Sequence, residues 1–409
     1  MSNPEHTWGR TIDFGEEYYQ NALKILRALR GDAAIIGALA ARCTAALKSG
    51  RKVYVNAVSG HMPRLELANE REGNPALFEF SSAGFTPEQY AAMGPGDVLL
   101  TNSVSADTLG AREAGAYVVV ITTCYANNPS TPPGQVRANA NDWMPADVAS
   151  QVLESYIPWE QGLVQAPEVP EMAICPGSAI GTCSIHWMLT AEVAHALATD
   201  QTPDGSIGSQ YLDLMLQRLE DFHRRDLESA NALAAAVAKR IIAGGRFYVR
   251  SRNGGVQSEA TSVAQGVMLS NAFEPRPAAA GGNKDTFLIA AVSADDPREL
   301  AWADAARANG NYIIGIGSPE GRALQQRCDS YFDNRCPEAA GTIPIPGRDE
   351  AVSPATGIIN LIIMYVIKAQ FIDEMCRRGA VPYFWMGVYR PLGFDYIDMV
   401  KPFFKERGY

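Results

Sequence analysis

The sequence predicts an α/β protein of two domains, each with a parallel β-sheet flanked by helices. Three observations favour this fold class. The chain has 409 residues, which exceeds the usual size of a single hydrophobic core. Short apolar segments alternate with segments of helical periodicity, which is typical of parallel sheets covered by helices on both faces. Several phrases of the first half also recur in the second half in the same order.

The recurring phrases indicate two diverged copies of one unit. In the first of them, "GRKVYVNAVSG" resembles "GGRFYVRSRNG". Three segments of the first copy match segments of the second copy: 50–60 matches 244–254, 112–121 matches 307–316, and 178–188 matches 354–364. The polar, Gly- and Pro-bearing stretch 199–208 separates the copies, so we expect domains at residues 1–200 and 201–409.

Helical and strand-like segments follow one another through the first copy. Apolar residues at steps of three and four predict helices over 13–30 and 33–50, and Gly50 is a typical stop signal. The later predicted elements are strands at 52–58, 75–80, 97–102 and 117–122, with helices from about residue 63 and at 107–115. The second copy opens in the same way, with helical patterns over 209–230 and 226–245.

Composition restricts the class of partner and the cell compartment. A net charge of −10 and a pI near 5.1 argue against nucleic acid or an anionic membrane as the main partner. The seven cysteines contain no C-x-x-C pair, and the N-terminus has no apolar signal region, so we expect free thiols in the cytoplasm. The apolar stretch 357–367 is too short to span a bilayer and predicts a buried core helix.

A dense group of hydroxyls follows one predicted strand. The segment "TNSVSADT" (101–108) places Ser103, Ser105 and Thr108 between that strand and the next helix. In parallel sheets, ligands bind beyond the carboxyl ends of the strands, where helix N-termini favour anions. Hydroxyl donors suit a phosphate group. Helix capping by Ser105 or Asp107 is the alternative, but it accounts for only one of these side chains.

These motifs resemble the SIS (sugar isomerase) domain. The chain here has a strand, the pattern S-x-S-x-x-T, a helix and then "AGAYVVVIT". This order is similar to the phosphate-binding region of that family, although Ala106 stands where the family usually has glycine. "VSGHM" with Glu66, and "YFDNRCPEAAGTIPIPGRDEAVSPATGIINLII" in the second copy, resemble a subgroup of bacterial SIS proteins of unassigned function. The resemblance covers roughly residues 33–198 and 227–390, and it implies two SIS-like three-layer domains that bind phosphosugars.

The resemblance to tandem SIS enzymes also implies roles for single residues. One half of such enzymes supplies the phosphate loop and the other a catalytic carboxylate. The second copy's "AAVSADD" (290–296) keeps Ser293 but has Asp296 in place of the threonine, so we do not expect phosphate there. Glu259 would be the base, and an ordinary glutamate in a helical first turn is the alternative.

Other candidates carry alternatives of the same kind. His61 would open the sugar ring or hydrogen-bond to backbone. Glu66 would be a second acid or base, or would pair with Arg64 or Arg71. The full predicted set comprises Glu259, His61 and Glu66 for catalysis, and Ser59, Ser103, Ser105, Thr108, Arg250 and Arg252 for substrate and anion binding.

Three further features have less specific predictions. Arg250 and Arg252 would hold an anionic group, face solvent or bridge the domains. His186 lies in a predicted core helix and is expected to be structural. The aromatic C-terminal segment with Lys401 is expected to pack across the interface of a homodimer.

The predicted function is that of a phosphosugar aldose–ketose isomerase, or of a related deglycase or deaminase that works by enolisation. The alternatives are a lyase of the etherase type and a non-catalytic regulator that binds sugar phosphates. The expected partner is a sugar or sugar phosphate. The resemblance implies no organic cofactor, and no metal is expected because no His/Cys cluster has zinc spacing.

Overall fold

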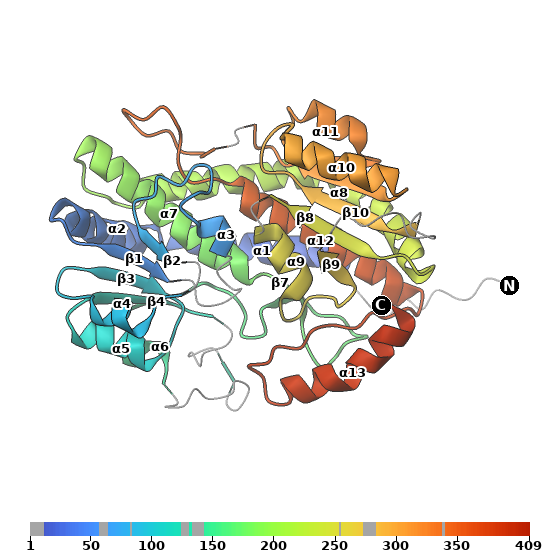
Figure 1. The fold of residues 1–409 in the computed structure, drawn as a ribbon, viewed down its shortest axis with the longest axis horizontal. Coiled ribbons are helices and arrows are strands. Elements are labelled where there is room, and N and C mark those ends of the chain that lie inside the picture. The colour runs from blue at the N-terminus through green and yellow to red at the C-terminus, as the bar shows by residue number, and fades with distance from the viewer. Residues whose placement is uncertain are drawn as a thin grey trace.

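The computed structural model describes residues 12–56, 64–81, 84–123, 131–132, 143–252, 255–272, 284–337 and 340–409. It confirms the predicted fold class. Two five-stranded sheets, parallel throughout, are each covered by helices on both faces (Figure 1).

The first sheet contains β1 to β5 in the order β2-β1-β3-β4-β5. Its strands are β1 (Val53–Asn56), β2 (Glu79–Ser81), β3 (Val98–Thr101), β4 (Tyr117–Ile121) and β5 (Gln151–Leu153). The helices of this half are α1 (Phe14–Gly31), α2 (Ala33–Lys48), α3 (Arg64–Leu67), α4 (Pro87–Ala91), α5 (Ala106–Glu113), α6 (Pro145–Val148) and α7 (Ser178–Thr199). A short antiparallel pair, β6 (Gly162–Val164) and β7 (Ile174–Pro176), precedes α7.

The second sheet has the order β12-β11-β10-β8-β9, which is the same connectivity written from the other edge. Its strands are β8 (Phe247–Ser251), β9 (Ser270–Ala272), β10 (Thr286–Ala290), β11 (Tyr312–Gly317) and β12 (Ser330–Asp333). The helices of this half are α8 (Ser206–Ile242), α9 (Gly255–Ser262), α10 (Pro297–Ala308), α11 (Arg322–Arg327), α12 (Thr356–Arg377) and α13 (Gly393–Arg407).

Alternating side chains on the strands divide the core into three clusters. In β3, Leu99 joins an outer cluster under α4, α5 and α6, whereas Leu100 joins the central cluster. In β10, Ile289 packs beneath α10 and α11, whereas Leu288 faces the same central cluster. Since successive strand residues point to opposite faces, each sheet is buried on both sides. The long helices α1, α7, α8 and α12 therefore form an inner layer that both halves share.

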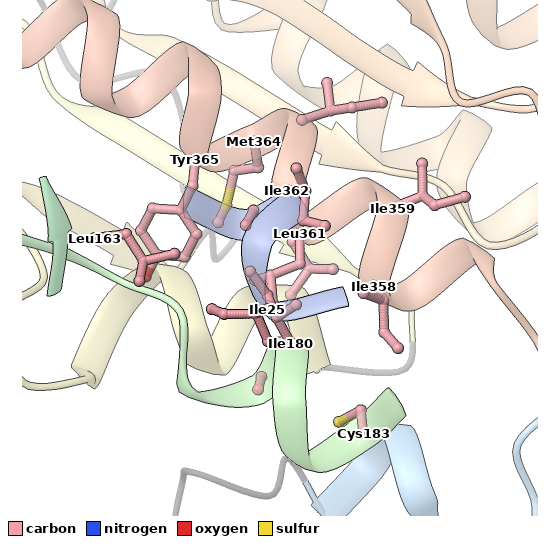
Figure 2. Close-up of a cluster of buried hydrophobic side chains, with 14 of the residues drawn as sticks. Ile25, Leu163, Ile180, Cys183, Ile358, Ile359, Leu361, Ile362, Met364 and Tyr365 are labelled. Atoms are coloured by element: carbon pink, nitrogen blue, oxygen red, sulfur yellow. The ribbon is translucent and has the colours of Figure 1, made fainter. Parts of the chain in front are cut away.

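Helix α12 is the apolar helix that the sequence indicated, and its burial is confirmed. By length and composition alone it could cross a membrane, but 94% of its most apolar window lies buried inside the protein. It runs to Arg377, well beyond the apolar stretch, and it encloses Lys368, which is 0% exposed. Figure 2 shows Ile358, Leu361 and Tyr365 of α12 in the central cluster with Ile180 and Cys183 of α7.

Two helical details differ between the halves. The helical patterns predicted over 209–230 and 226–245 form the single 37-residue helix α8. In the first half, Asp32 separates α1 from α2. The start of α1 also contacts the second half, because Phe14 and Gly15 donate backbone hydrogen bonds to Asp373 and Gln370 of α12 at 3.3 and 3.2 Å.

Candidate functional site

The hydroxyl loop lies between β3 and α5, where the sequence places it. Ser105 caps α5: its Oγ accepts a hydrogen bond from the backbone N–H of Thr108 at 3.3 Å and lies 3.0 Å from the Thr108 hydroxyl. The backbone N–H of Ser103 donates to Thr101 Oγ1 at 3.0 Å. Ser103 and Ser105 are half-buried, whereas Thr108 is fully buried. The capping role of Ser105 is thus real, and the loop also exposes part of two hydroxyl-bearing residues at a helix N-terminus.

Tyr90 connects this loop to the end of β1. Asn56, the last residue of β1, is in register with Thr101 of β3 and donates its Nδ2 hydrogen bond to the Tyr90 hydroxyl. Burial raises the pKa of Tyr90, while hydrogen bonding to Thr108 and Asn56 lowers it. The phenol therefore stays neutral and holds the carboxyl ends of β1 and β3 together. Neither Asn56 nor Tyr90 is among the site residues predicted from the sequence.

Glu259 lies on α9 and is 1% exposed. Within the described part of the chain, neither of its carboxylate oxygens has a hydrogen-bond partner. Burial raises the carboxyl pKa from 4.5 to about 8, although the nearby positive charge of Lys368 lowers it. An unpaired buried carboxyl of this kind is mostly protonated at neutral pH and is a stronger base than an ordinary carboxylate when it ionises.

Glu66 lies on α3 and is held by Arg71. Its Oε2 accepts a hydrogen bond from Arg71 Nε at 3.3 Å, as one of the sequence alternatives proposed. Arg71 also donates to Thr356 Oγ1, in the first turn of α12, at 2.6 Å. Burial raises the carboxyl pKa of Glu66, and the Arg71 charge opposes that effect. The second oxygen, Oε1, makes no well-formed hydrogen bond in the described structure, and the nearby Trp187 side chain also lowers the carboxyl pKa.

One small cavity brings the two glutamates together. It is lined by residues from both halves, with a volume of about 10 Å³, which accommodates about one water molecule. The lining comprises Glu66, Ala179, Cys183, Gly255, Val256, Glu259, Gly357, Ile358 and Leu361. Glu66 follows β1 and Glu259 follows β8, the first strands of their sheets. The two carboxyl groups therefore come from corresponding places in the two halves.

Gly357 lets Glu66 approach the start of α12. A Cβ atom at this position would lie 2.1 Å from Glu66 Oε1, so any other residue here would force the Glu66 carboxyl group to shift. The carboxylate consequently packs against the first turn of α12, where helix N–H groups favour a negative charge. The repeated segments 178–188 and 354–364 become the first turns of α7 and α12, and both contribute to the cavity.

The arginine candidates are engaged within the protein. Arg252 pairs with Glu72 of the first half and lies 3.5 and 3.7 Å from carboxylate oxygens of Asp296 and Glu299. It thus bridges the halves, as one sequence alternative stated. Arg250 lies over the ring of Trp302, 4.6 Å from its centroid.

The loop of the second copy has its own internal carboxylates. Asp296 caps α10 by accepting from the backbone N–H of Arg298 at 2.9 Å. Glu299, which is 0% exposed, accepts from the backbone N–H of Val292 at 2.9 Å. Two carboxyl side chains therefore lie at the loop that corresponds to 101–108, and the pKa of Asp296 is lowered so that it carries a negative charge.

The remaining candidates divide into those described and those that are not. Ser59 and His61 lie outside the described residues. His186 is buried in α7, and burial lowers its pKa to about 3, so its predicted place in a core helix is confirmed. Lys401 is exposed on α13 and lies 3.4 Å from Asp398. The homodimer and the cytoplasmic location stay predictions.

Comparison with known proteins finds one similar sequence and several solved structures of similar fold, but no family. No family model matches the chain. A UPF0309 protein from Streptomyces griseus subsp. griseus is 22% identical over 222 residues, which span 44% of this chain and 87% of that protein.

Solved structures of similar architecture cover most of the chain. A Silicibacter pomeroyi protein provisionally assigned as a phosphosugar isomerase has a TM-score of 0.48 and 16% identity, over 90% of this chain and 99% of that one. The C-terminal domain of glucosamine-fructose-6-phosphate aminotransferase from Francisella tularensis has a TM-score of 0.46 and 11% identity, over 90% and 98%. At such low identity, the reaction has to be argued from the site itself.

Proposed function

We propose that the protein is a phosphosugar-binding enzyme that interconverts aldose and ketose through an enediol. The observation that carries this proposal is Glu259, a buried carboxyl group without a hydrogen-bond partner in the described structure, on the wall of a cavity shared by both halves. An isomerase of this type needs a base that takes a proton from C2 and returns it to C1. A carboxylate that is poorly solvated removes that proton more readily than an exposed one.

The hydroxyl loop is the proposed phosphate site. Ser103 and Ser105 lie at the N-terminus of α5, which favours an anion. The buried Thr108 hydroxyl contacts the Ser105 hydroxyl and so helps to fix the position of Ser105 in the loop. Together with the motif resemblance, this geometry favours binding of a phosphate group by the first half. Ser59 and His61 keep their proposed roles from the sequence, in anion binding and ring opening.

Glu66 is proposed to move the hydroxyl proton during the reaction. Enolisation of an open-chain aldose breaks the C2–H bond, and the ketose forms when that proton reaches C1 and the O2 proton reaches O1. Glu259 would carry the first proton and Glu66 the second, because both line the same cavity. A sugar phosphate is much larger than this cavity, so the proposal places only the C1–C2 edge of the sugar towards it.

Glu259→Gln separates binding from turnover. The variant keeps the shape of the side chain but cannot accept a proton, so we expect no isomerisation and unchanged thermal stabilisation by sugar phosphates. Wild-type protein screened against sugar phosphates and free sugar acids identifies the ligand class. Unchanged turnover in the variant would exclude Glu259 as the base. Release of a second product molecule by the wild type would instead indicate a lyase.

A further inference from the structure

Two side chains of α12 hold the C-terminal turn of α9. The last carbonyl groups of a helix have no partner inside that helix. Here the Tyr365 hydroxyl donates to the Glu259 carbonyl oxygen at 2.5 Å, and Lys368 Nζ donates to the Ala260 carbonyl oxygen at 2.8 Å. Residues three apart lie on one face of a helix. This face of α12 is therefore aimed at the turn that carries Glu259.

Lys368 is an unusual residue for its position. It is 0% exposed in the middle of α12, between Ile367 and Ala369. Removing an ammonium group from water is costly, and burial accordingly lowers the pKa of Lys368 to about 8. Leucine or methionine would fill the same space without that cost. A cation retained here points to an electrostatic role: its ammonium group donates to the Ala260 carbonyl oxygen, and its charge lowers the pKa of the Glu259 carboxyl group.

The other titratable groups around Glu259 and Lys368 stay neutral near pH 7. Burial raises the pKa of each of them above its ordinary value. They are Tyr365 on α12, Tyr18 on α1, Cys183 on α7 and Cys175 on β7. Across the cavity, Glu66 on α3 is already paired with Arg71. Among the residues that the structure describes, Lys368 is consequently the cation that acts on the Glu259 carboxyl group.

We propose that Lys368 is a positioning residue of this site: its ammonium group anchors the C-terminal turn of α9 and favours the ionised, basic form of Glu259. The inference rests on the proposed function, because it assigns Lys368 a role through the base. The positive charge also complements the negative end of the α9 dipole. Tyr365 anchors the same turn without contributing charge. Both residues thus fix the position of the turn, but only Lys368 changes the pKa of the Glu259 carboxyl group.

The test is a carboxyl titration that does not depend on turnover. Protein labelled with ¹³C at the glutamate carboxyl carbon is titrated by NMR, and Glu259→Gln identifies the Glu259 signal. Lys368→Gln removes the charge and keeps a donor for the Ala260 carbonyl. We expect the pKa of Glu259 to rise by about 1 to 3 in this variant. The acid limb of the pH–rate profile should move to higher pH by the same amount, and Lys368→Arg should partly restore it.

Tyr365→Phe is the matched control. It removes one hydrogen bond to the same turn but no charge, so the Glu259 titration should remain close to that of the wild type. The Lys368 ¹³Cε titration, compared between the wild type and Glu259→Gln, supplies a second measurement. The charge of Glu259 raises the pKa of Lys368, so the Lys368 titration should move to lower pH in Glu259→Gln. That measurement decides the proposal if the Lys368 variants do not fold.

The outcomes distinguish this inference from the proposed function. Titration of Glu259 at the same pH in wild type and Lys368→Gln would overturn the inference, as would titration of Lys368 at the same pH in wild type and Glu259→Gln. A shifted titration in a protein that converts no sugar would support the Lys368–Glu259 coupling and contradict the proposed function instead.

Discussion

Glu259→Gln should change how folding stability depends on pH. The wild-type carboxyl group is buried without a hydrogen-bond partner in the described structure, and its pKa is about 8 in the folded protein against 4.5 ordinarily. Between these two values the folded chain holds one proton more than the unfolded chain. The free energy of unfolding therefore falls as the pH rises through this window. Glutamine does not ionise, so the variant lacks that loss.

The magnitude follows from the size of the pKa shift. Each pH unit in the window corresponds to about 1.4 kcal/mol of differential stability. At neutral pH, roughly 2.5 units above the ordinary pKa, the wild-type glutamate lowers the free energy of unfolding by roughly 3 kcal/mol. This group is fully buried, so solvent does not screen the effect appreciably.

Urea unfolding of both proteins at several pH values measures the difference directly. We expect the free energy of unfolding of the Gln variant to increase relative to that of the wild type by about 1.4 kcal/mol per pH unit between about pH 5 and 8. Glu299→Gln is a matched control. Burial raises the pKa of Glu299 to about 7, so its stability difference from the wild type should stop changing near pH 7 instead of pH 8. A wild-type-to-variant difference for Glu259 that does not change with pH would refute the reasoning.

Three further predictions concern the rest of the site. Arg71→Met leaves the Glu66 carboxylate buried without its cation, so denaturant titration should show that the free energy of unfolding falls by about 3 to 5 kcal/mol. A fall below about 1 kcal/mol would show that the ion pair is dispensable. Ser105→Ala removes the cap of α5 and should cost about 1 kcal/mol; calorimetry should show weaker sugar-phosphate binding, whereas Ser293→Ala, at the corresponding place in the second copy, should leave affinity unchanged. Equal weakening by both would contradict the division of roles between the loops. For turnover, kcat/KM should rise with pH through about 8, because Glu259 must ionise and its pKa lies there; a rate that falls over this range would be inconsistent with a carboxylate base.

The fold was accessible from the sequence because local patterns determine it. Strand segments such as 97–102 and 117–122 are apolar, short and separated by helical periodicity, and they became β3 and β4. The loop 101–108 lies at the strand-to-helix junction for the same reason. Its cap could also be predicted, since Ser105 stands at the position that helix start signals favour.

The surroundings of the two glutamates depend on contacts between distant segments. Arg71 reaches Thr356, 285 positions along the chain, and no periodicity predicts such a pair. Lys368 follows an apolar stretch and resembles a helix end by composition, yet α12 continues past it and buries it. The available signal was the helical spacing itself, because extending the pattern to Arg377 would have placed this lysine inside the core.

Proton exchange at the sugar C2 position tests the central claim most directly. Wild-type protein and Glu259→Gln are incubated in D₂O with a series of aldose and ketose phosphates, and deuterium at C2 of the aldose is followed by NMR. The account predicts incorporation by the wild type for at least one sugar that binds, and none by the variant. Sugar phosphates that bind the wild-type protein but never exchange the C2 proton would contradict an enolising enzyme.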